Sequence, residues 1–347
     1  MPPRLRLFAL LPLAAGVLAL ATLAPAQPPR ARTYLFCFWN VENLFDDRVN
    51  PKLEKVDREF DDYFAKNREA LEKKLDRLTE VLLGPEVNGG NGPDILALAE
   101  VESLRAVELV RDALNRRLRD KALHYRTAVY RDPQGGRSIA TAVLSRVPVD
   151  EKRTRLLGRY QRILRVHLLA GRSELVVIAS HWTSRVSDKA GRGRSGYARQ
   201  IHDDFVNAYR SNPAVDYLVC GDFNDTPADP AVVNDLAATG DLKRVLGLTR
   251  QDRPLFYNPF AELAQKGKGT HAFGDRPFVF DQVCLSPGLL DGEGWSYVNR
   301  SAAIIEKFTF RGRPDRFGGP ADRRPWRNRG ASDHYPVTIQ LRAPAAS

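Results

Sequence analysis

The sequence predicts an α+β fold in which β-sheets pack face to face and helices cover their outer faces. Runs rich in β-branched and aromatic residues recur along the chain, and Gly, Pro or polar clusters bound them, as is typical of strands. Between Tyr125 and His181 several such runs follow one another with no room for helices, so a strict alternation of strand and helix fails. Three other segments place apolar residues at helical spacing and provide the flanking helices.

The predicted strands share this composition and occur along the whole chain. They span Tyr34–Val41, Ile95–Val101, Tyr125–Tyr130, Ala140–Ser145, Ile163–Leu169, Leu175–Ser180, Tyr217–Gly221, Phe278–Leu285 and Pro336–Leu341.

The predicted helices each show one apolar stripe, because residues three or four apart lie on the same face of a helix. The stripes are Leu71, Leu75, Leu78 and Leu82; Val107, Val110, Leu114 and Leu118; and Tyr197, Ile201, Phe205 and Tyr209. Two segments are predicted to be loops: the Gly- and Asn-rich Glu86–Pro93 and the basic Arg311–Gly330.

The composition indicates a globular protein with a basic surface. The 347 residues are 43% hydrophobic, which argues against wholesale disorder, and three Cys exclude a disulfide scaffold. The formal charge is +11, and only 12 of the 53 basic residues are lysine. An excess of Arg suits phosphate-bearing partners because its guanidinium offers a planar fork of donors. Genome-wide codon bias towards Arg is the alternative explanation.

The N-terminus has the pattern of a secretory signal peptide. Arg4 and Arg6 precede an apolar run, and Ala24-Pro25-Ala26 supplies small residues for cleavage. We expect residues 1–26 to be removed, residues 27–347 to form one domain, and the protein to be exported to the periplasm or outside the cell. An uncleaved anchor helix is the alternative. No other run approaches 18 apolar residues, so no stable membrane insertion is expected after cleavage.

Export places the cysteines in oxidising surroundings, yet each lies inside an apolar strand-like run. We therefore expect Cys37, Cys220 and Cys284 to be buried as small hydrophobic residues. One disulfide with an odd cysteine left over is the alternative.

Polar residues that could carry chemistry gather where the predicted strands end. A single carboxylate there is often only a turn former, but six strands that each deliver such a group at one edge would create repulsion that a cation relieves. The ligands offered are O and N atoms without a Cys cluster, which favours Mg²⁺ or Mn²⁺. The residues in question are Asn40, Glu42, Glu100, His181, Asp222, Asn224, Asp281, Asp333 and His334.

The order of these motifs resembles that of the endonuclease/exonuclease/phosphatase family, which includes DNase I. The motifs are Trp39-Asn40-Val41-Glu42, Glu100 after a strand, Ser180-His181-Trp182, Gly221-Asp222-Phe223-Asn224, Phe280-Asp281-Gln282-Val283 and Ser332-Asp333-His334. The resemblance covers about residues 33–342. An exported bacterial branch of the family is especially similar in two segments, Asn40-Val41-Glu42-Asn43-Leu44-Phe45-Asp46 and Glu100-Val101-Glu102. The resemblance implies a four-layered α/β sandwich, two packed mixed sheets flanked by helices.

The resemblance also implies roles for individual residues. Glu100, Asn40, Glu42 and Asp333 match the metal side of the family's site. Asp222 matches the residue that positions or deprotonates water, Asn224 the Asn beside the scissile phosphate, and His334, oriented by Asp281, the phosphate-contacting or general-base His. His181 matches the His of the DNase I and sphingomyelinase branches, and Arg162 is a weaker match to a phosphate-contacting Arg. Glu102 is expected to point outward or to start a helix.

These roles predict a Mg²⁺- or Mn²⁺-dependent phosphoesterase. A nuclease acting on DNA or another nucleic acid is the leading expectation, with the basic loop, its aromatic residues and the segment Arg185–Arg199 contacting the substrate. The alternatives are a phosphomonoesterase or phospholipase-C-type hydrolase of phosphorylated headgroups, and a non-catalytic binding protein on the same fold. No obligatory protein partner is evident in the sequence.

Overall fold

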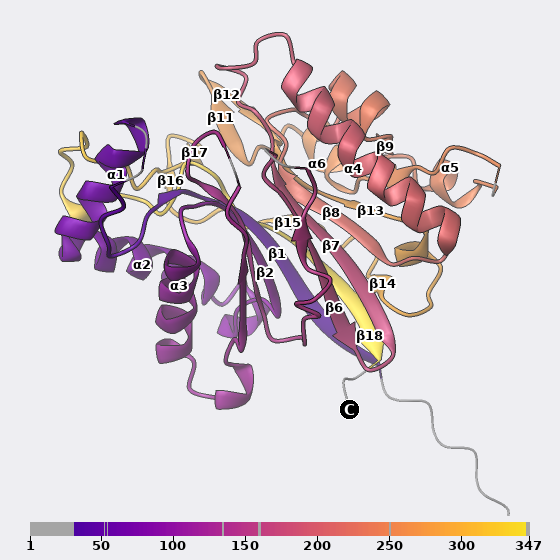
Figure 1. Cartoon of the computed structure of the whole chain (residues 1–347), viewed down its shortest axis with the longest axis horizontal. Coiled ribbons are helices and arrows are strands. Elements are labelled where there is room, and N and C mark those ends of the chain that lie inside the picture. The colour runs from indigo at the N-terminus through magenta and orange to yellow at the C-terminus, as the bar shows by residue number, and fades with distance from the viewer. Residues whose placement is uncertain are drawn as a thin grey trace, which may run out of the picture.

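Two mixed β-sheets lie face to face between layers of helices in the computed structural model (Figure 1). The structure describes residues 31–344 except 52, 54, 134, 159, 160 and 250, so the predicted signal peptide 1–26 lies outside the described residues. The four-layered α/β sandwich that the sequence predicts is confirmed.

Each large sheet has seven strands. In the first sheet the order is β14 (Ser296–Tyr297), β18 (Val337–Pro344), β1 (Ala31–Leu44), β2 (Ile95–Val101), β4 (Ala140–Ser145) and β3 (Thr127–Tyr130), with β15 (Ala303–Ile304) also on β18. In the second sheet the order is β5 (Arg155–Leu156), β6 (Ile163–Ala170), β7 (Ser173–His181), β8 (Tyr217–Asp222), β13 (Asp281–Leu285), β10 (Phe256–Tyr257) and β9 (Ala238–Thr239). Two hairpins complete the strands: β11 (His271–Phe273) with β12 (Arg276–Phe278), and β16 (Thr309–Phe310) with β17 (Arg313–Pro314).

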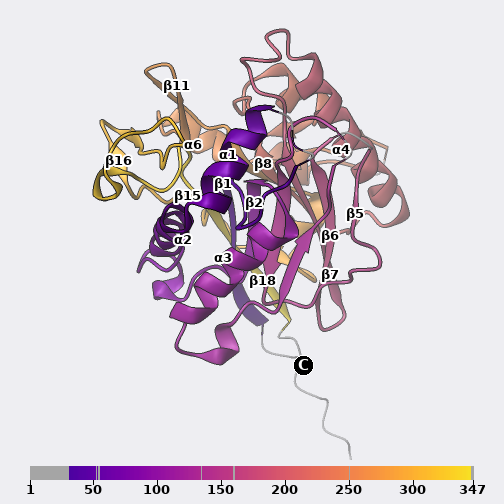
Figure 2. The same cartoon turned by 60° about the vertical axis from the view of Figure 1, so that its left-hand side comes forward.

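Helices cover the outer face of each sheet (Figure 2). On the first sheet these are α1 (Lys55–Lys66), α2 (Arg68–Leu82) and α3 (Leu104–Arg117), and on the second α4 (Arg192–Ser211). Shorter helical segments are α5 (Leu242–Leu246), α6 (Phe260–Gln265) and η1–η5 (Asn88–Gly90, Lys121–Leu123, Ala231–Asp235, Pro287–Leu290, Trp326–Asn328).

Strand β1 shows why this sequence forms a sandwich. Its side chains alternate between faces, as strand geometry requires: Phe36 and Phe38 pack in the core between the sheets, whereas Cys37 and Trp39 pack against the helix layer. Both faces are therefore apolar, which is typical of a central strand covered on both sides.

Most predicted elements are present, including the three striped helices and the turn at Glu86–Pro93. The predicted strand Phe278–Leu285 is in fact two strands, because the chain leaves β12 at Phe278 and enters β13 only at Asp281. Helix α1 has no predicted counterpart. None of the helices in the described part of the chain combines the length and apolar character that a bilayer-spanning segment needs.

The cysteine prediction is confirmed. Cys37, Cys220 and Cys284 are free thiols buried in the three core clusters. Burial raises the pKa of each thiol, so they pack as small apolar side chains.

We expect Leu78→Ala to lower the free energy of unfolding by about 2–5 kcal/mol, because the substitution leaves a cavity under a fully buried helix face. Leu104→Ala, at a 44% exposed position of α3, should change it by less than about 0.5 kcal/mol. Urea unfolding monitored by circular dichroism measures both; equal losses would contradict the layer assignment.

Candidate active site

Asp222 lies where three strands of the second sheet bring polar side chains together. His181 stands opposite Asp222 in the parallel pairing of β7 and β8, and Asp281 stands opposite Asp222 in the antiparallel pairing of β8 and β13. Paired residues on neighbouring strands share a face of the sheet. All three side chains are buried, so three of the predicted catalytic residues meet at one edge of this sheet.

His334 reaches the same place from the first sheet. It lies on the turn before β18, where the Trp39 indole donates to its carbonyl oxygen at 2.8 Å. Its Nδ1 donates to Asp281 Oδ2 at 2.7 Å, and its Nε2 lies 3.7 Å from Asp222 Oδ2. One buried imidazole thus connects the ends of both sheets.

The charges in this cluster set its protonation. Burial alone lowers the pKa of His334, but the carboxylates of Asp281, Asp222 and Asp333 outweigh burial and raise this pKa well above its ordinary value. Burial raises the pKa of Asp222 to about 7, even though the charge of His334 lowers it. At neutral pH His334 is therefore an imidazolium, and Asp222 is close to its titration midpoint.

His181 has the opposite character. Burial lowers its pKa well below the ordinary value, and the nearby cations of Arg162 and His334 lower it further. Its Nε2 lies 3.6 Å from Asp222 Oδ2, while its buried Nδ1 has no hydrogen-bond partner among the described residues. The site thus holds one neutral and one charged histidine on either side of Asp222.

Glu100 is joined to Asp222 by a single amide. Asn40 Nδ2 donates to Glu100 Oε1 at 3.2 Å and to Asp222 Oδ2 at 3.1 Å. The second Glu100 oxygen accepts from the backbone N–H of Asn43 at 2.9 Å. The hydrogen bonds from Asn40 therefore span the gap between the two sheets.

Several of these residues have a strained backbone conformation that sets the direction of their side chains. Glu42, Asn43, Glu100 and Asn224 all have positive φ, between 49° and 61°. This left-handed conformation costs a non-glycine residue on the order of 1–3 kcal/mol and persists only where surrounding structure enforces it. At Glu100 it coincides with a register shift in the pairing of β2, and the side chain leaves the strand towards Asn40.

Glu42 is turned away from this centre. Its carboxylate accepts from Arg316 Nε at 2.9 Å and from the backbone N–H groups of Phe317 and Gly318 at 2.8 and 3.2 Å. Burial raises the pKa of Glu42 to about 7, and the charge of Asp333 adds to this effect. The structure thus uses Glu42 to hold the basic loop.

Asp333 lies beside Glu42 and His334, at the border between the centre and the loop. Its carboxylate lies within 4.8 Å of a ring nitrogen of both His271 and His334. Burial raises the pKa of Asp333, but neighbouring cations, first His334, outweigh burial and lower it below the ordinary value. Asp333 therefore remains ionised.

Asn224 and Arg162 border the cluster. Asn224 donates through its backbone N–H to Asp222 Oδ1 at 2.9 Å and through its amide to the Trp182 carbonyl at 3.3 Å. The carbonyl of Arg162 accepts from the backbone N–H of His181 at 3.2 Å. The half-buried Arg162 guanidinium makes no ion pair among the described residues, so its donors are available to an anion.

Two residues at this site have no counterpart among the predicted site residues. His271, on β11, stacks on His334 with ring centroids 4.2 Å apart and donates from Nδ1 to the Asp333 carbonyl. Lys74 is fully buried in α2, where its Nζ donates to the Ala331 carbonyl at 2.8 Å. In the sequence, Lys74 could have been noticed as a charged residue next to the leucine stripe of α2. No sequence pattern singled out His271.

The basic loop Arg311–Gly330 is held by its own ion pairs. Arg324 donates to Asp315 and Asp322, and the buried Arg329 packs over Trp326. Of the two aromatic residues of this loop that were expected to offer a stacking surface, Phe317 does not, because its ring is 1% exposed and stacks on the half-buried Trp326.

The second basic segment, Arg185–Arg199, is also largely committed to internal contacts. Arg185 pairs with Asp225 and Asp229, and Arg194 is buried against Asp225. Much of the positive charge that the sequence suggested for substrate contacts therefore stabilises the loops around the site.

Comparison with known protein families shows which family this chain belongs to. A family model described as "Endonuclease/Exonuclease/phosphatase family" matches residues 35–343. The chain belongs to the endonuclease/exonuclease/phosphatase family. This match confirms the resemblance seen in the motifs. Members of this family hydrolyse phosphoester bonds and generally use divalent metal ions. No curated protein matches the chain.

Solved structures of this family share the fold at low sequence identity. Truncated Caenorhabditis elegans TDP2 matches with a TM-score of 0.51 and 16% identity, over 90% of this chain and 98% of that one. Danio rerio TDP2 complexed with single-strand DNA product matches with a TM-score of 0.51 and 14% identity, over 89% and 98%. A Bacteroides thetaiotaomicron family protein matches with a TM-score of 0.52 and 13% identity, over 90% and 98%.

The side chains at the centre fit a hard divalent cation. Glu100 is not fully buried and forms no ion pair with Lys or Arg among the described residues, and its oxygens lie in one hydrogen-bonded group with Asn40 and Asp222. Carboxylate and amide oxygens are the donors that Mg²⁺ and Mn²⁺ prefer. We therefore assign the strongest candidate ligand role to Glu100. Asn40 turns its amide nitrogen towards Glu100, and its oxygen accepts from the backbone N–H of Glu42 at 3.1 Å, so in this structure Asn40 positions Glu100 and does not present a second oxygen ligand.

We expect Glu100→Gln to weaken Mn²⁺ binding by at least about tenfold, because the substitution removes the charge of this ligand while keeping its shape. Glu293→Gln, at an exposed position remote from the site, should leave binding unchanged. Isothermal titration with Mn²⁺ measures both, and equal affinities for the two variants would contradict the assignment.

The raised pKa of Asp222 predicts a pH dependence of stability in EDTA. Between about pH 4 and 7 the folded protein retains a proton that the unfolded chain releases, so this residue's contribution to stability falls as pH rises, by up to about 1.4 kcal/mol per pH unit, and levels off above pH 7. Asp222→Asn cannot titrate and should gain stability relative to wild type across that range. Urea unfolding from pH 4 to 8.5 measures the difference; a constant difference would contradict the shift.

Proposed function

We propose that this protein is an exported, divalent-metal-assisted phosphodiesterase that acts on nucleic acid. The observation that carries the proposal is the buried connection from Asp281 through His334 and Asp222 to Asn40 and Glu100. It places an imidazolium, a carboxylate near its pKa and a candidate metal ligand around one point.

The protonation states suggest a role for each group. Asp222, whose pKa is about 7, accepts a proton from water near neutral pH. His334 is already charged, so we assign it to donate a hydrogen bond to a phosphate oxygen, with Asp281 fixing its ring. A bound divalent cation supplies stabilisation of the negative charge that develops on the phosphate.

The remaining residues complete the phosphate site. We assign the Asn224 amide and the Arg162 guanidinium to donate to non-bridging oxygens. Neutral His181, beside Asp222, is assigned a further hydrogen bond to a non-bridging oxygen, because a neutral imidazole can donate an N–H but is not an acid at this pH. Glu42 and Asp333 hold the wall of this site, Glu42 through its bonds to the basic loop, and Asp333 adds a carboxylate on the metal side.

Nucleic acid is the proposed substrate on two grounds. The chain carries a net positive charge, and a structure of similar fold, Danio rerio TDP2, is complexed with single-strand DNA product. The N-terminal pattern of residues 1–26 supports export to the periplasm or outside the cell. A phosphomonoesterase or phospholipase-C-type activity on phosphorylated headgroups is the alternative that shares this centre.

The deciding experiment offers plasmid DNA, single-stranded DNA, RNA, sphingomyelin and inositol phosphates with Mg²⁺ or Mn²⁺, with and without EDTA. We expect EDTA-sensitive cleavage of nucleic acid. Cleavage of only the headgroup substrates would replace the proposed substrate, and no hydrolysis of any substrate would overturn the proposed function.

We expect His334→Ala to lower phosphodiesterase turnover by 100-fold or more, because it removes the charged donor at the phosphate. His124→Ala removes a histidine whose ring, among the described residues, bonds only the Leu118 carbonyl, and this variant should stay within about twofold of wild type. Initial-rate assays measure both, and wild-type turnover in His334→Ala would refute the assigned role.

A further inference from the structure

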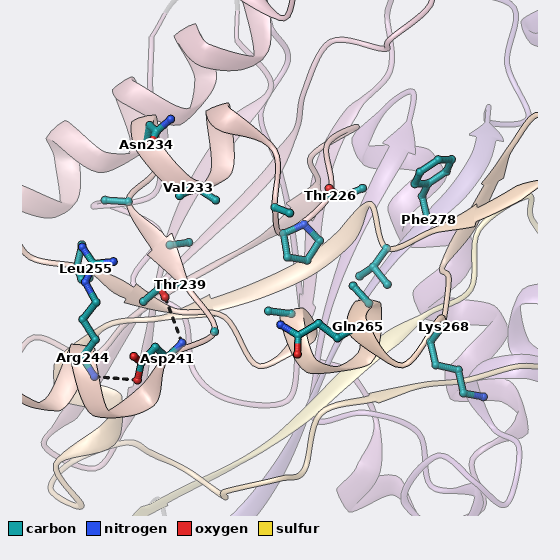
Figure 3. Close-up of a pocket in the computed structure, with 18 of the residues that line it drawn as sticks. Thr226, Val233, Asn234, Thr239, Asp241, Arg244, Leu255, Gln265, Lys268 and Phe278 are labelled. Carbon is teal, nitrogen blue, oxygen red and sulfur yellow. Dashed lines mark hydrogen bonds between the residues drawn. The ribbon is translucent and has the colours of Figure 1, made fainter.

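A large cavity lies on the β9 side of the site, and nothing in the roles assigned above uses it (Figure 3). It has a volume of about 1210 Å³, above the roughly 300–1,000 Å³ of ordinary small-ligand pockets. One end is formed by Thr226, two residues after Asn224, and by Phe278, three residues before Asp281. The two segments that present catalytic residues thus continue directly into the cavity wall.

A ladder of stacked rings connects the catalytic histidine with this cavity. His334 stacks on His271 at 4.2 Å, His271 on Phe280 at 5.9 Å, and Phe280 on Phe278 at 5.4 Å, with interplanar angles of 23°, 26° and 6°. Phe278 is half-buried and is one of the residues that line the cavity, and the guanidinium carbon of Arg185 lies 5.6 Å from the centroid of its ring. A planar group stacked on Phe278 would extend this ladder into the cavity.

The cavity lining is suited to flat, polar-edged groups followed by anions. Small side chains form part of its wall: Ala228, Ala237, Ala238, Ala261 and Ala264. The side-chain amides of Asn234 and Gln265 and the guanidinium of Arg244 line it, and none of the three makes a side-chain hydrogen bond or ion pair among the described residues. Figure 3 shows Phe278 and Thr226 towards one end and Arg244 towards the other.

The charges at the cavity leave Arg244 and Arg253 without a carboxylate partner. Asp241 caps α5 through the backbone N–H of Arg244, and Asp252 accepts from Thr249. Among the described residues, Arg253 donates to the carbonyls of Asn234 and Asp235 and to His202, so its guanidinium is already engaged. The guanidinium of Arg244 at the far end is therefore the one available to a phosphate.

We propose that this cavity binds the nucleotides next to the scissile phosphate of a single-stranded nucleic acid, with a base stacked on Phe278 and a backbone phosphate at Arg244. Bases present donor and acceptor edges that match free amides, and they stack on aromatic rings regardless of sequence. The volume accommodates more than one nucleotide. This inference rests on the proposed function and adds a substrate class to it.

The first test fills the cavity. Val233→Trp introduces a large side chain from a position that is 43% exposed and lines the cavity, and Leu246→Trp introduces the same side chain at a 55% exposed position outside it. Each variant is assayed on a labelled ten-nucleotide single strand and on bis(p-nitrophenyl) phosphate, which reaches only the catalytic centre. We expect Val233→Trp to raise the KM of the oligonucleotide by about tenfold, with the small substrate unchanged and Leu246→Trp like wild type.

The second test removes the two named contacts without adding bulk. Phe278→Ala is compared with Phe273→Ala, which removes a 42% exposed ring from the same hairpin outside the cavity. Arg244→Ala is compared with its neighbour Lys243→Ala. We expect about five- to tenfold higher KM for the oligonucleotide in Phe278→Ala and Arg244→Ala only, and a smaller effect of salt on KM in Arg244→Ala.

The outcomes separate this inference from the proposed function. Hydrolysis of the small substrate with an unchanged oligonucleotide KM in all three cavity variants would overturn the cavity assignment and leave the phosphodiesterase intact. A higher KM for sphingomyelin, with that of the oligonucleotide unchanged, would identify a headgroup as the occupant and overturn it also. If the wild-type protein hydrolyses neither the oligonucleotide nor bis(p-nitrophenyl) phosphate, the proposed function itself is refuted.

Discussion

The hydrogen bond between Asp281 and His334 is the interaction on which the site depends. It joins β13 of one sheet to the turn before β18 of the other at 2.7 Å, and neither residue is more than 6% exposed. Breaking one partner of such a buried pair leaves an uncompensated charge, which is strongly destabilising. The pair therefore fixes both the charge on the imidazole and the relative position of the two sheet edges. Asp222 lies beside the His334 ring, and Asn40 donates a hydrogen bond to Asp222.

Much of the fold could be predicted from the sequence because its signals are local. Leucine stripes and uninterrupted apolar runs identified α2 and the central strands β1, β2, β7 and β8. The motifs at the ends of these strands identified Asn40, Glu100, His181 and Asn224, which the structure brings together around Asp222. Helix α1 escaped prediction because its few buried residues, Asp57, Asp61 and Phe64, include two acids and form no apolar stripe.

Other parts of the site depend on contacts between distant segments. In the sequence, Glu42 looks like one more acidic residue of the site. Only the packed loop shows that its carboxylate oxygens accept hydrogen bonds from N–H groups of residues 316–318. The arginine-rich composition suggested free charge, whereas Arg185, Arg194, Arg324 and Arg329 are committed to internal partners. Glu102 was expected to point outward or to start a helix; it directly precedes Ser103, the N-cap of α3, but it is 7% exposed, and burial raises its pKa to about 7.

The central claim is that His334 is a charged, hydrogen-bonded donor at neutral pH. Two-dimensional NMR of ¹⁵N-histidine-labelled protein, with His334 assigned by its loss in His334→Asn, tests this claim without relying on any substrate. We predict that both ring nitrogens of His334 are protonated at pH 7.5 and that Asp281→Asn shifts the ring towards its neutral form at the same pH. A neutral His334 ring in the wild-type protein at pH 7.5 would contradict the account.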